Sequence, residues 1–299
     1  MKQLNIEIFE QIAFDKGCDI AFPLKEKMLI EVISQLISRF HNENGKLIFG
    51  GGTSLVSAYG ELTKRFSEDA DFRFVPCPKS TKNIRVELVN IANTLDGFKL
   101  IEDPISDSHK IEFRFEDSEH FIREHSSLRP YIKLEVFFTD NLFYRPMNRQ
   151  ICSCYNKCAL LPAETEALCV SLQDTAIDKI SSFLWRIYSD NTPKSSFAPA
   201  DMRHLHDLYF LTQQFKIDDE FKQYVLTVAN SDIKYRLKEN LSFKDVTKQV
   251  LVQLKNNQKY QNDFIRYVKN MSYAKTNEQL NFDNAYTTFA TLLNKLSGE

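Results

Sequence analysis

Two neighbouring strings decide the fold of this chain: Phe49-Gly50-Gly51-Gly52-Thr53-Ser54-Leu55, and then Arg65-Phe66-Ser67-Glu68-Asp69-Ala70-Asp71-Phe72-Arg73-Phe74. The apolar segment from Lys46 to Phe49 is predicted to be a strand, and the glycines that follow it are predicted to open a helix. A second strand near Asp69 would place Asp69 and Asp71 on one face, because side chains alternate along a strand. The residues between and after them, Ala70, Phe72 and Phe74, would then face the core.

This combination of a glycine turn and two carboxylates suits a nucleoside triphosphate. Two adjacent carboxylates repel each other, and a shared hard cation such as Mg²⁺ or Mn²⁺ relieves that repulsion. The backbone N–H groups of Gly51 and Gly52 can cradle phosphate, and the hydroxyls of Thr53 and Ser54 can cap the helix or donate to phosphate. Taken alone, the glycines are explained equally well by an ordinary capped turn, so this prediction depends on the aspartates downstream.

These motifs resemble the signature of the polymerase-β-type nucleotidyltransferases. The string Arg65-Phe66-Ser67-Glu68-Asp69 before the second aspartate resembles more narrowly the AbiEii/AbiGii toxin family of nucleotidyltransferases. The resemblance implies an α/β (α+β) nucleotidyltransferase domain with a mixed sheet, followed by a helical-bundle domain. It also implies that Asp69 and Asp71 are catalytic and hold the divalent cation that bridges the triphosphate.

Hydrophobic periodicity predicts a two-part organisation, with an α/β domain over residues 1–161 and a helical domain over residues 162–299. In the first part, helices are predicted at residues 4–17, 24–40 and 82–94, and alternating strands at 110–115 and 131–138. After Pro162 the strand signals end, and helices are predicted from Thr165 to Tyr188 and from Met202 to Gln214.

A third carboxylate is expected, because two-metal phosphoryl chemistry usually needs one more acid to hold the metal that activates the attacking hydroxyl. Glu135 is the candidate catalytic and metal-binding residue, since it lies on the polar face of the strand at 131–138, in a string resembling one where the family places an acid. Glu112 is the second choice by the same strand argument. The alternatives are an exposed strand glutamate or simple charge balance between Lys133 and Glu135.

Two helical strings extend the resemblance, Asp178-Lys179 through Arg186 and Arg203-His204 through Asp207-Leu208-Tyr209. The resemblance implies that Lys179 contacts the β- and γ-phosphates, that Arg186 also binds the nucleotide, and that Asp207 holds Lys179 or Arg203 in position. Ordinary surface salt bridges would produce the same spacings. The family commonly has an Arg-Asp pair where this chain has Arg203-His204, which leaves Asp207 as the acid that matches.

Histidine and cysteine patterns do not predict a metal site. His204 and His206 are two residues apart, so they do not share a helix face. The cysteines at 152, 154 and 158 fit no common zinc spacing, and their role is left open.

Basic and aromatic residues interleave between Leu241 and Lys275, a segment called here the basic stretch. Its cations are Lys244, Lys248, Lys255, Lys259, Arg266, Lys269 and Lys275, and its aromatic residues are Phe243, Tyr260, Phe264, Tyr267 and Tyr273. Such a pattern suits an RNA backbone with unstacked bases. The alternative, which the helical spacing of the aromatic residues favours, is a helix pair with an aromatic core and solvated lysines.

Composition adds few constraints. The formal net charge of −2 gives no general sign of nucleic-acid binding, and neither a membrane span nor an export signal is evident, so a cytoplasmic protein is expected. The resemblance implies a toxin that transfers a nucleoside monophosphate from an NTP to an acceptor, expected to be the tRNA 3′ end, and that has an antitoxin partner. The alternatives are nucleotidylation of a protein side chain and a non-catalytic binding module on the same fold.

Overall fold

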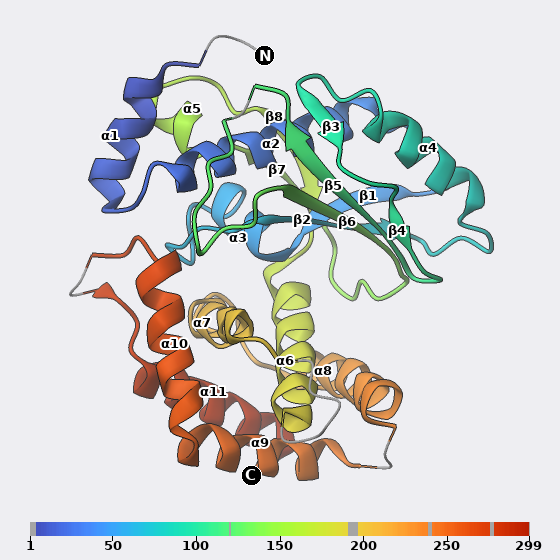
Figure 1. The fold of residues 1–299 in the computed structure, drawn as a ribbon. Helices are drawn as coiled ribbons and strands as arrows, with labels where there is room; N and C mark the ends of the chain where they lie inside the picture. Colours follow the sequence, from blue (N-terminus) through green and yellow to red (C-terminus); the bar gives the residue numbers. More distant parts are fainter. Residues whose placement is uncertain (1–3, 120, 191–196, 239–240, 276–277, 299) are drawn as a thin grey trace. The chain divides into compact units, whose positions relative to one another are not determined.

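The computed structural model describes residues 4–119, 121–190, 197–238, 241–275 and 278–298 (Figure 1). The chain divides into two compact units, Met1–Ser171 and Leu172–Glu299. The first unit contains a mixed sheet with helices, and the second contains helices in its described residues, in agreement with the predicted fold class. The division falls later than the boundary predicted after residue 161.

The sheet of the first unit is mixed. In the described residues it has the order β3-β5-β6-β2-β1-β8-β7, and β4 pairs with β5 at one side. Pairing is parallel between β2 and β6 and between β1 and β8, and the other pairs are antiparallel. Its strands are β1 (Lys46–Gly50), β2 (Asp69–Val75), β3 (Phe98–Leu100), β4 (Ile105–Ser106), β5 (Lys110–Asp117), β6 (Ile132–Phe138), β7 (Met147–Ile151) and β8 (Thr165–Cys169).

Alternation along the central strands separates an apolar face from a charged face. Ala70, Phe72 and Phe74 of β2 are buried in the core, as predicted, together with apolar residues of β5 and β6. Helices α2 and α4 contribute to the same core, through residues such as Met28, Leu29 and Leu88. The helices of this unit are α1 (Ile6–Lys16), α2 (Ala21–Arg39), α3 (Gly51–Ser57), α4 (Lys82–Ala92) and α5 (Cys154–Cys158).

One helix prediction is wrong at its start. The segment Thr165–Cys169 is strand β8, and helix α6 begins at Leu172. Its residues Thr-Glu-Ala-Leu-Cys carry no strong strand pattern, but β8 pairs with β7 along its whole length and with β1 at Phe49. Tertiary pairing therefore overrides a weak local preference, and it extends the first unit to Ser171.

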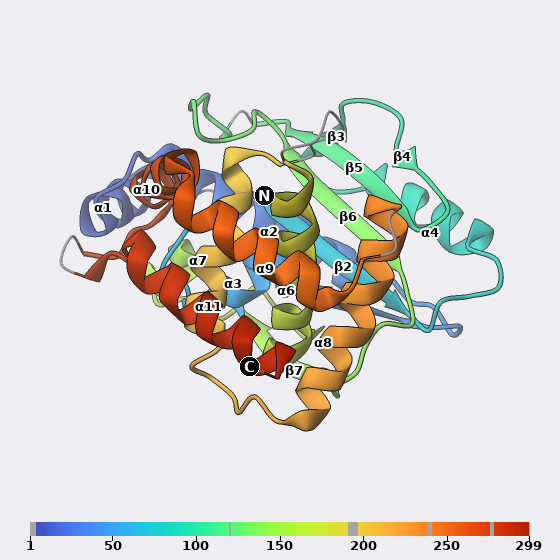
Figure 2. The ribbon, with the colours of Figure 1, turned by 90° about the horizontal axis from the view of Figure 1, so that it is seen from below.

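In the second unit, α6 packs against α7, α8 and α9, and α11 packs against α7 and α9 (Figure 2). Its elements are α6 (Leu172–Ser189), η1 (Pro199–Asp201), α7 (Met202–Leu211), α8 (Asp219–Asp232), the π-helical turn η2 (Ile233–Leu237), α9 (Phe243–Asn256), α10 (Gln258–Met271) and α11 (Phe282–Ser297). Among the described residues, none of the helices has the length and hydrophobicity that a membrane span requires.

Candidate active site

The glycine turn joins β1 directly to α3 and brings the backbone close to the second aspartate. Gly51 has φ +71°, a conformation that favours glycine. A Cβ atom at this position would lie 2.8 Å from Cγ of Asp71 and closer still to Oδ2. A side chain at Gly52 would likewise lie 2.9 Å from Oγ of Ser67. The glycines are therefore required by the close approach of the turn to the strand that carries the aspartates.

The hydroxyls of Thr53 and Ser54 hold this turn together. Thr53 is buried, and its Oγ1 donates to the carbonyl of Asp69 at 2.5 Å. Ser54 Oγ donates to the carbonyl of Gly51 at 2.9 Å. The prediction that Thr53 or Ser54 caps α3 is wrong, because the N-cap is Gly50 and no side chain bonds there. Donation from these hydroxyls to phosphate stays a prediction.

Four carboxylates lie on the charged face of three adjacent strands, and they are called here the acidic row: Asp69 and Asp71 on β2, Glu135 on β6, and Glu112 on β5. Asp71 is paired in register with Gly50 of β1 on one side and with Glu135 on the other. Glu112 is in turn directly opposite Glu135, and the three strands β5, β6 and β2 lie side by side in the sheet (Figure 1). Strand register thus brings together the two aspartates and both predicted candidates for the third acid.

Protein cations surround the acidic row. Arg129 Nη1 contacts Asp69 Oδ1. Glu135 accepts from Lys110 and Lys133, each at 2.5 Å. Carboxylates that face each other across a strand pair are destabilising, so these cations stabilise the row.

Glu112 has cationic partners of its own. Its carboxylate accepts from Arg114 at 2.8 Å and from Lys110 at 3.2 Å. Burial raises the pKa of Glu112, but Arg114, Lys133 and Lys110 outweigh it and lower that pKa overall. The pairing of Lys133 with Glu135, named above as an alternative to a catalytic role for Glu135, is also present, and Glu135 is in register with Asp71.

The donor chemistry of the row fits a hard divalent cation, since Asp69, Asp71 and Glu135 offer carboxylate oxygens on one face. Within the described ranges, His, Cys, Asp and Glu side chains form no group of three that could hold a metal ion. Arg129 and the two lysines contact the oxygens that a cation would need, so Asp69, Asp71 and Glu135 stay predicted ligands.

In the second unit, Lys179 and Asp207 form a buried ion pair. Lys179 Nζ on α6 lies 2.7 Å from Asp207 Oδ2 on α7, and their side chains are 7% and 0% exposed. The sequence named this pair as one of two possibilities for Asp207. A buried pair of this kind fixes the ammonium group in place, and contact with phosphate stays a prediction.

Arg186 is paired on neighbouring elements of the same unit. Its Nη1 lies 3.1 Å from Asp201 Oδ2, and its guanidinium lies 4.7 Å from the ring centroid of Trp185. His204, in place of the family's acid, is buried, and within the described part of the chain neither ring nitrogen has a hydrogen-bond partner. Burial, with Lys179 and two arginines nearby, lowers the pKa of His204 well below its usual value, which keeps the ring neutral.

Comparison with known proteins identifies the family of the chain. Residues 35–291 match the protein family described as "Nucleotidyl transferase AbiEii toxin, Type IV TA system". The chain belongs to this family. It is therefore a nucleotidyltransferase toxin of a type IV toxin–antitoxin system, a class that uses an NTP and a divalent metal and that has an antitoxin partner.

One solved structure supports the fold of this AbiEii-family protein. MenT4, a nucleotidyltransferase toxin from Mycobacterium tuberculosis H37Rv, aligns with 99% of this chain and 91% of its own at 14% identity, with a TM-score of 0.69. An antigenic nucleotidyltransferase-like protein from Paracoccidioides brasiliensis aligns with 75% of this chain and 92% of its own at 15% identity, with a TM-score of 0.40. None of the curated proteins matches the sequence. The MenT4 likeness confirms the predicted fold class.

Several residues beside the candidate site were not predicted from the sequence. Arg65 is buried beside Gly52, and its Nη1 donates to the carbonyl of Phe66 at 2.7 Å. Lys25 of α2 lies 3.0 Å from Glu68, directly before β2. Burial lowers the pKa of Lys25, against the opposing effect of Glu68. Arg65 and Glu68 belong to the string quoted at the outset, but nothing in the sequence near Lys25 indicates its partner.

Four aromatic residues of the basic stretch are not exposed, so bases could not stack on them. Phe243, Tyr260, Phe264 and Tyr267 are buried in the helical unit, whereas Lys255, Lys259, Arg266 and Lys269 are exposed. The alternative favoured above, aromatic core positions with solvated cations, is thereby confirmed for these residues.

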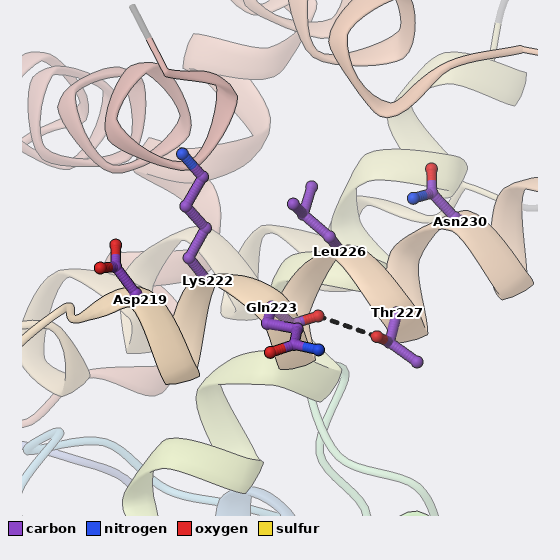
Figure 3. A pocket seen from close by; sticks show the side chains of 6 residues that line it. All are labelled: Asp219, Lys222, Gln223, Leu226, Thr227 and Asn230. Atoms are coloured by element: carbon purple, nitrogen blue, oxygen red, sulfur yellow. Dashed lines mark hydrogen bonds between the residues drawn. The ribbon is translucent and has the colours of Figure 1, made fainter.

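Surface hollows among the described residues lie apart from the predicted site residues. One of about 420 Å³ lies along α8, where Lys222, Leu226 and Asn230 line it (Figure 3). Another, of about 440 Å³, is lined by Lys27, Tyr155 and Glu164 in the first unit. Neither hollow is lined by a carboxylate of the acidic row, so neither is part of the candidate active site.

Proposed function

We propose that this toxin transfers a nucleoside monophosphate from an NTP to the hydroxyl at the 3′ end of tRNA. In that reaction the acceptor oxygen bonds to the α-phosphorus, the bond to the bridging oxygen breaks, and pyrophosphate leaves. The observation that carries the proposal is the position of Asp71, between the glycine turn at Gly51 and the carboxylate strand position of Glu135.

Each predicted site residue has a role in the proposal. Asp69, Asp71 and Glu135 would hold Mg²⁺ or Mn²⁺, which supplies charge neutralisation for the triphosphate and activation of the acceptor hydroxyl. The backbone N–H groups of Gly51 and Gly52 would bind phosphate, as glycine turns at the start of a helix do. Lys179, held by Asp207, would bind the β- and γ-phosphates as a fixed positive charge.

Protein nucleotidylation is the second candidate, because the buried aromatic residues of the basic stretch cannot favour RNA by stacking on its bases. Its chemistry is identical, and only the acceptor hydroxyl differs. A non-catalytic module is disfavoured, since a fold with no catalysis has no reason to keep clustered carboxylates that cost stability.

The test is a transfer assay with each α-labelled NTP, Mg²⁺ or Mn²⁺, total RNA and total protein. We expect label on RNA of tRNA length, released by digestion of the 3′ end. Label on protein alone would replace the tRNA proposal with protein nucleotidylation. For variants of the acidic row in this assay, the matched control is Asp103→Asn, since Asp103 is exposed and lies outside the acidic row. A wild-type protein that labels neither acceptor would contradict the proposed transfer.

A further inference from the structure

Arg129 is held at three points beside the first aspartate of the acidic row. Its guanidinium contacts Asp69 Oδ1, and its side chain is 34% exposed. Its backbone N–H donates to Glu68 Oε2 at 2.7 Å. Its carbonyl accepts from Lys25 Nζ, which also lies 3.0 Å from the same Glu68 oxygen. Both backbone polar groups of Arg129 are therefore fixed by one buried ion pair.

Lys25 is unusual in this arrangement because its side chain is only 2% exposed. A buried ammonium group is costly unless it is paired and hydrogen-bonded. Both partners of Lys25 are linked to Asp69, since Glu68 directly precedes Asp69 in the chain and Arg129 contacts its carboxylate. The buried lysine thus fixes the position of the guanidinium relative to the aspartate strand.

The two glutamates of the acidic row are also paired with cations. Glu135 accepts from Lys110 and Lys133, and the described part of the chain holds no three-ligand metal group. A guanidinium and a divalent cation that use the same carboxylate oxygen exclude each other, because both are positive and need the same lone pairs. Binding of a cation at Oδ1 of Asp69 would therefore displace the Arg129 guanidinium from that oxygen.

We propose that Arg129 is a built-in counter-ion for Asp69, which a divalent cation displaces on binding, and that Lys25 and Glu68 position Arg129 for this role. The inference rests on the proposed function, because it takes Asp69 as a metal ligand. It explains how the carboxylates are kept together before the cation and the NTP bind. It also predicts that the toxin's metal affinity without NTP is set partly by its own arginine.

The experiment titrates the full-length protein with MnCl₂ alone, by calorimetry and by the electron paramagnetic resonance signal of free Mn²⁺. We expect Arg129→Met to bind Mn²⁺ about tenfold more tightly than wild type, since a competing positive charge is removed. Arg39→Met is the matched control, because Arg39 pairs with Asp96 outside the acidic row. It should bind Mn²⁺ as wild type does.

Lys25→Met tests the positioning role. We expect it to tighten Mn²⁺ binding by a smaller factor than Arg129→Met, and to have no further effect when the two changes are combined. Additive effects would show that Lys25 acts independently of Arg129. If Lys25→Met does not fold, Glu68→Gln replaces it in the same cycle.

The outcomes separate this inference from the proposed function. Equal or weaker Mn²⁺ binding by Arg129→Met would overturn the counter-ion role, even if the wild type transfers nucleotide normally. An Asp71→Asn variant that binds Mn²⁺ as tightly as wild type would instead contradict the metal site itself, and both proposals would fail. Tighter binding by Arg129→Met, lost again when Asp71→Asn is added, supports both.

Discussion

The strands that carry the acidic row and the basic stretch look similar in sequence, since each mixes charged residues with apolar or aromatic ones, yet the fold uses them differently. In the acidic row, strand register brings carboxylates face to face, and Asp69, Glu112 and Glu135 are mostly buried. In the basic stretch, helical periodicity turns the aromatic residues inward and leaves cations such as Arg266 and Lys269 in solvent.

The difference shows which charges need a functional explanation. Solvated lysines on a helix cost almost nothing and are expected on any helical surface. Buried carboxylates that oppose one another cost free energy unless the fold also places cations beside them, as it does here with Arg129, Lys110 and Lys133. Buried charges that need counter-ions are therefore better evidence of a functional site than an equal number of solvated charges on a helix. The variants below test this contrast, beginning with the largest expected effect.

Asp71→Asn should reduce transfer by about 10³-fold or more, because a neutral amide is a weak ligand for a hard cation and several kcal/mol of charge stabilisation are lost. The protein should remain folded, since the change also relieves repulsion within the row. Initial rates with labelled NTP and a thermal melt measure both effects. A folded variant with near wild-type rates would show that the acidic row is not the active site.

Lys179→Ala should lower kcat, raise KM for NTP, and destabilise the protein by about 3 kcal/mol or more, because Asp207 loses the buried cation that pairs with it. Chemical denaturation measures the loss of stability. The double variant Lys179→Met with Asp207→Asn removes the uncompensated charge and should recover much of that stability without recovering the kinetics. Normal NTP kinetics in the double variant would reduce the pair to a structural role.

Much of the acidic row follows from the sequence, because a period of two residues fixes which side chains share a face. That rule places Asp69 with Asp71, and Glu112 and Glu135 on the polar sides of their strands. It cannot give the order of the strands, and so it cannot show that Asp71, Glu135 and Glu112 are in register.

The cations around the row are beyond local patterns. Arg129 is 60 residues from Asp69, and Lys25 is 104 residues from Arg129, so no spacing rule connects them. Strand β8 escapes prediction for a related reason, since its pairing with β7 and β1 outweighs a residue composition that also suits a helix. The ion pair between Lys179 and Asp207 is one of the two pairings predicted for Asp207. The family resemblance, and not periodicity, is what points to both residues.

Gly51→Ala tests the close approach of the turn to Asp71. The matched control is Gly60→Ala, because Gly60 has nearly the same φ, +69° against +71°, but a Cβ atom there would have no described atom within 4 Å. Both variants should lose about 1–2 kcal/mol from the left-handed backbone. Only Gly51→Ala should lose more than that and also reduce transfer, since its Cβ displaces the Asp71 carboxylate. Equal effects of the two changes would show that the contact is unimportant.

Glu26→Gln examines a buried carboxyl group that has a thiol partner instead of a cation. Burial raises the pKa of Glu26, although hydrogen bonds from Cys154 and the charges of Lys157 and Lys16 oppose the rise. The neutral form is thus favoured in the folded protein, and wild-type stability falls as the pH rises above the ordinary Glu value of 4.5.

The side chain of the Glu26→Gln variant does not ionise, so the variant does not lose stability in this way. Relative to wild type, its unfolding free energy should therefore increase with pH, by on the order of 1 kcal/mol between about pH 5 and pH 8. Urea titrations at several pH values measure the difference. A difference that is constant with pH would contradict a raised pKa at Glu26.

The smallest effect is expected from replacing Lys255, Lys259, Arg266 and Lys269 together with glutamine. All four are exposed, although Lys259 pairs at 2.7 Å with Asp190, whose side chain is 8% exposed. The Tyr260 hydroxyl still donates to Asp190 after the change, so stability should fall by no more than about 1 kcal/mol, and NTP affinity should not change. If these four cations are only a solvated helical surface, acceptor binding should also keep its salt dependence, because no phosphate contact is lost. Binding to RNA at several salt concentrations measures this directly. A flatter salt slope, by about one counterion for each lost phosphate contact, would show that RNA does follow this surface and would remove the contrast between the two regions.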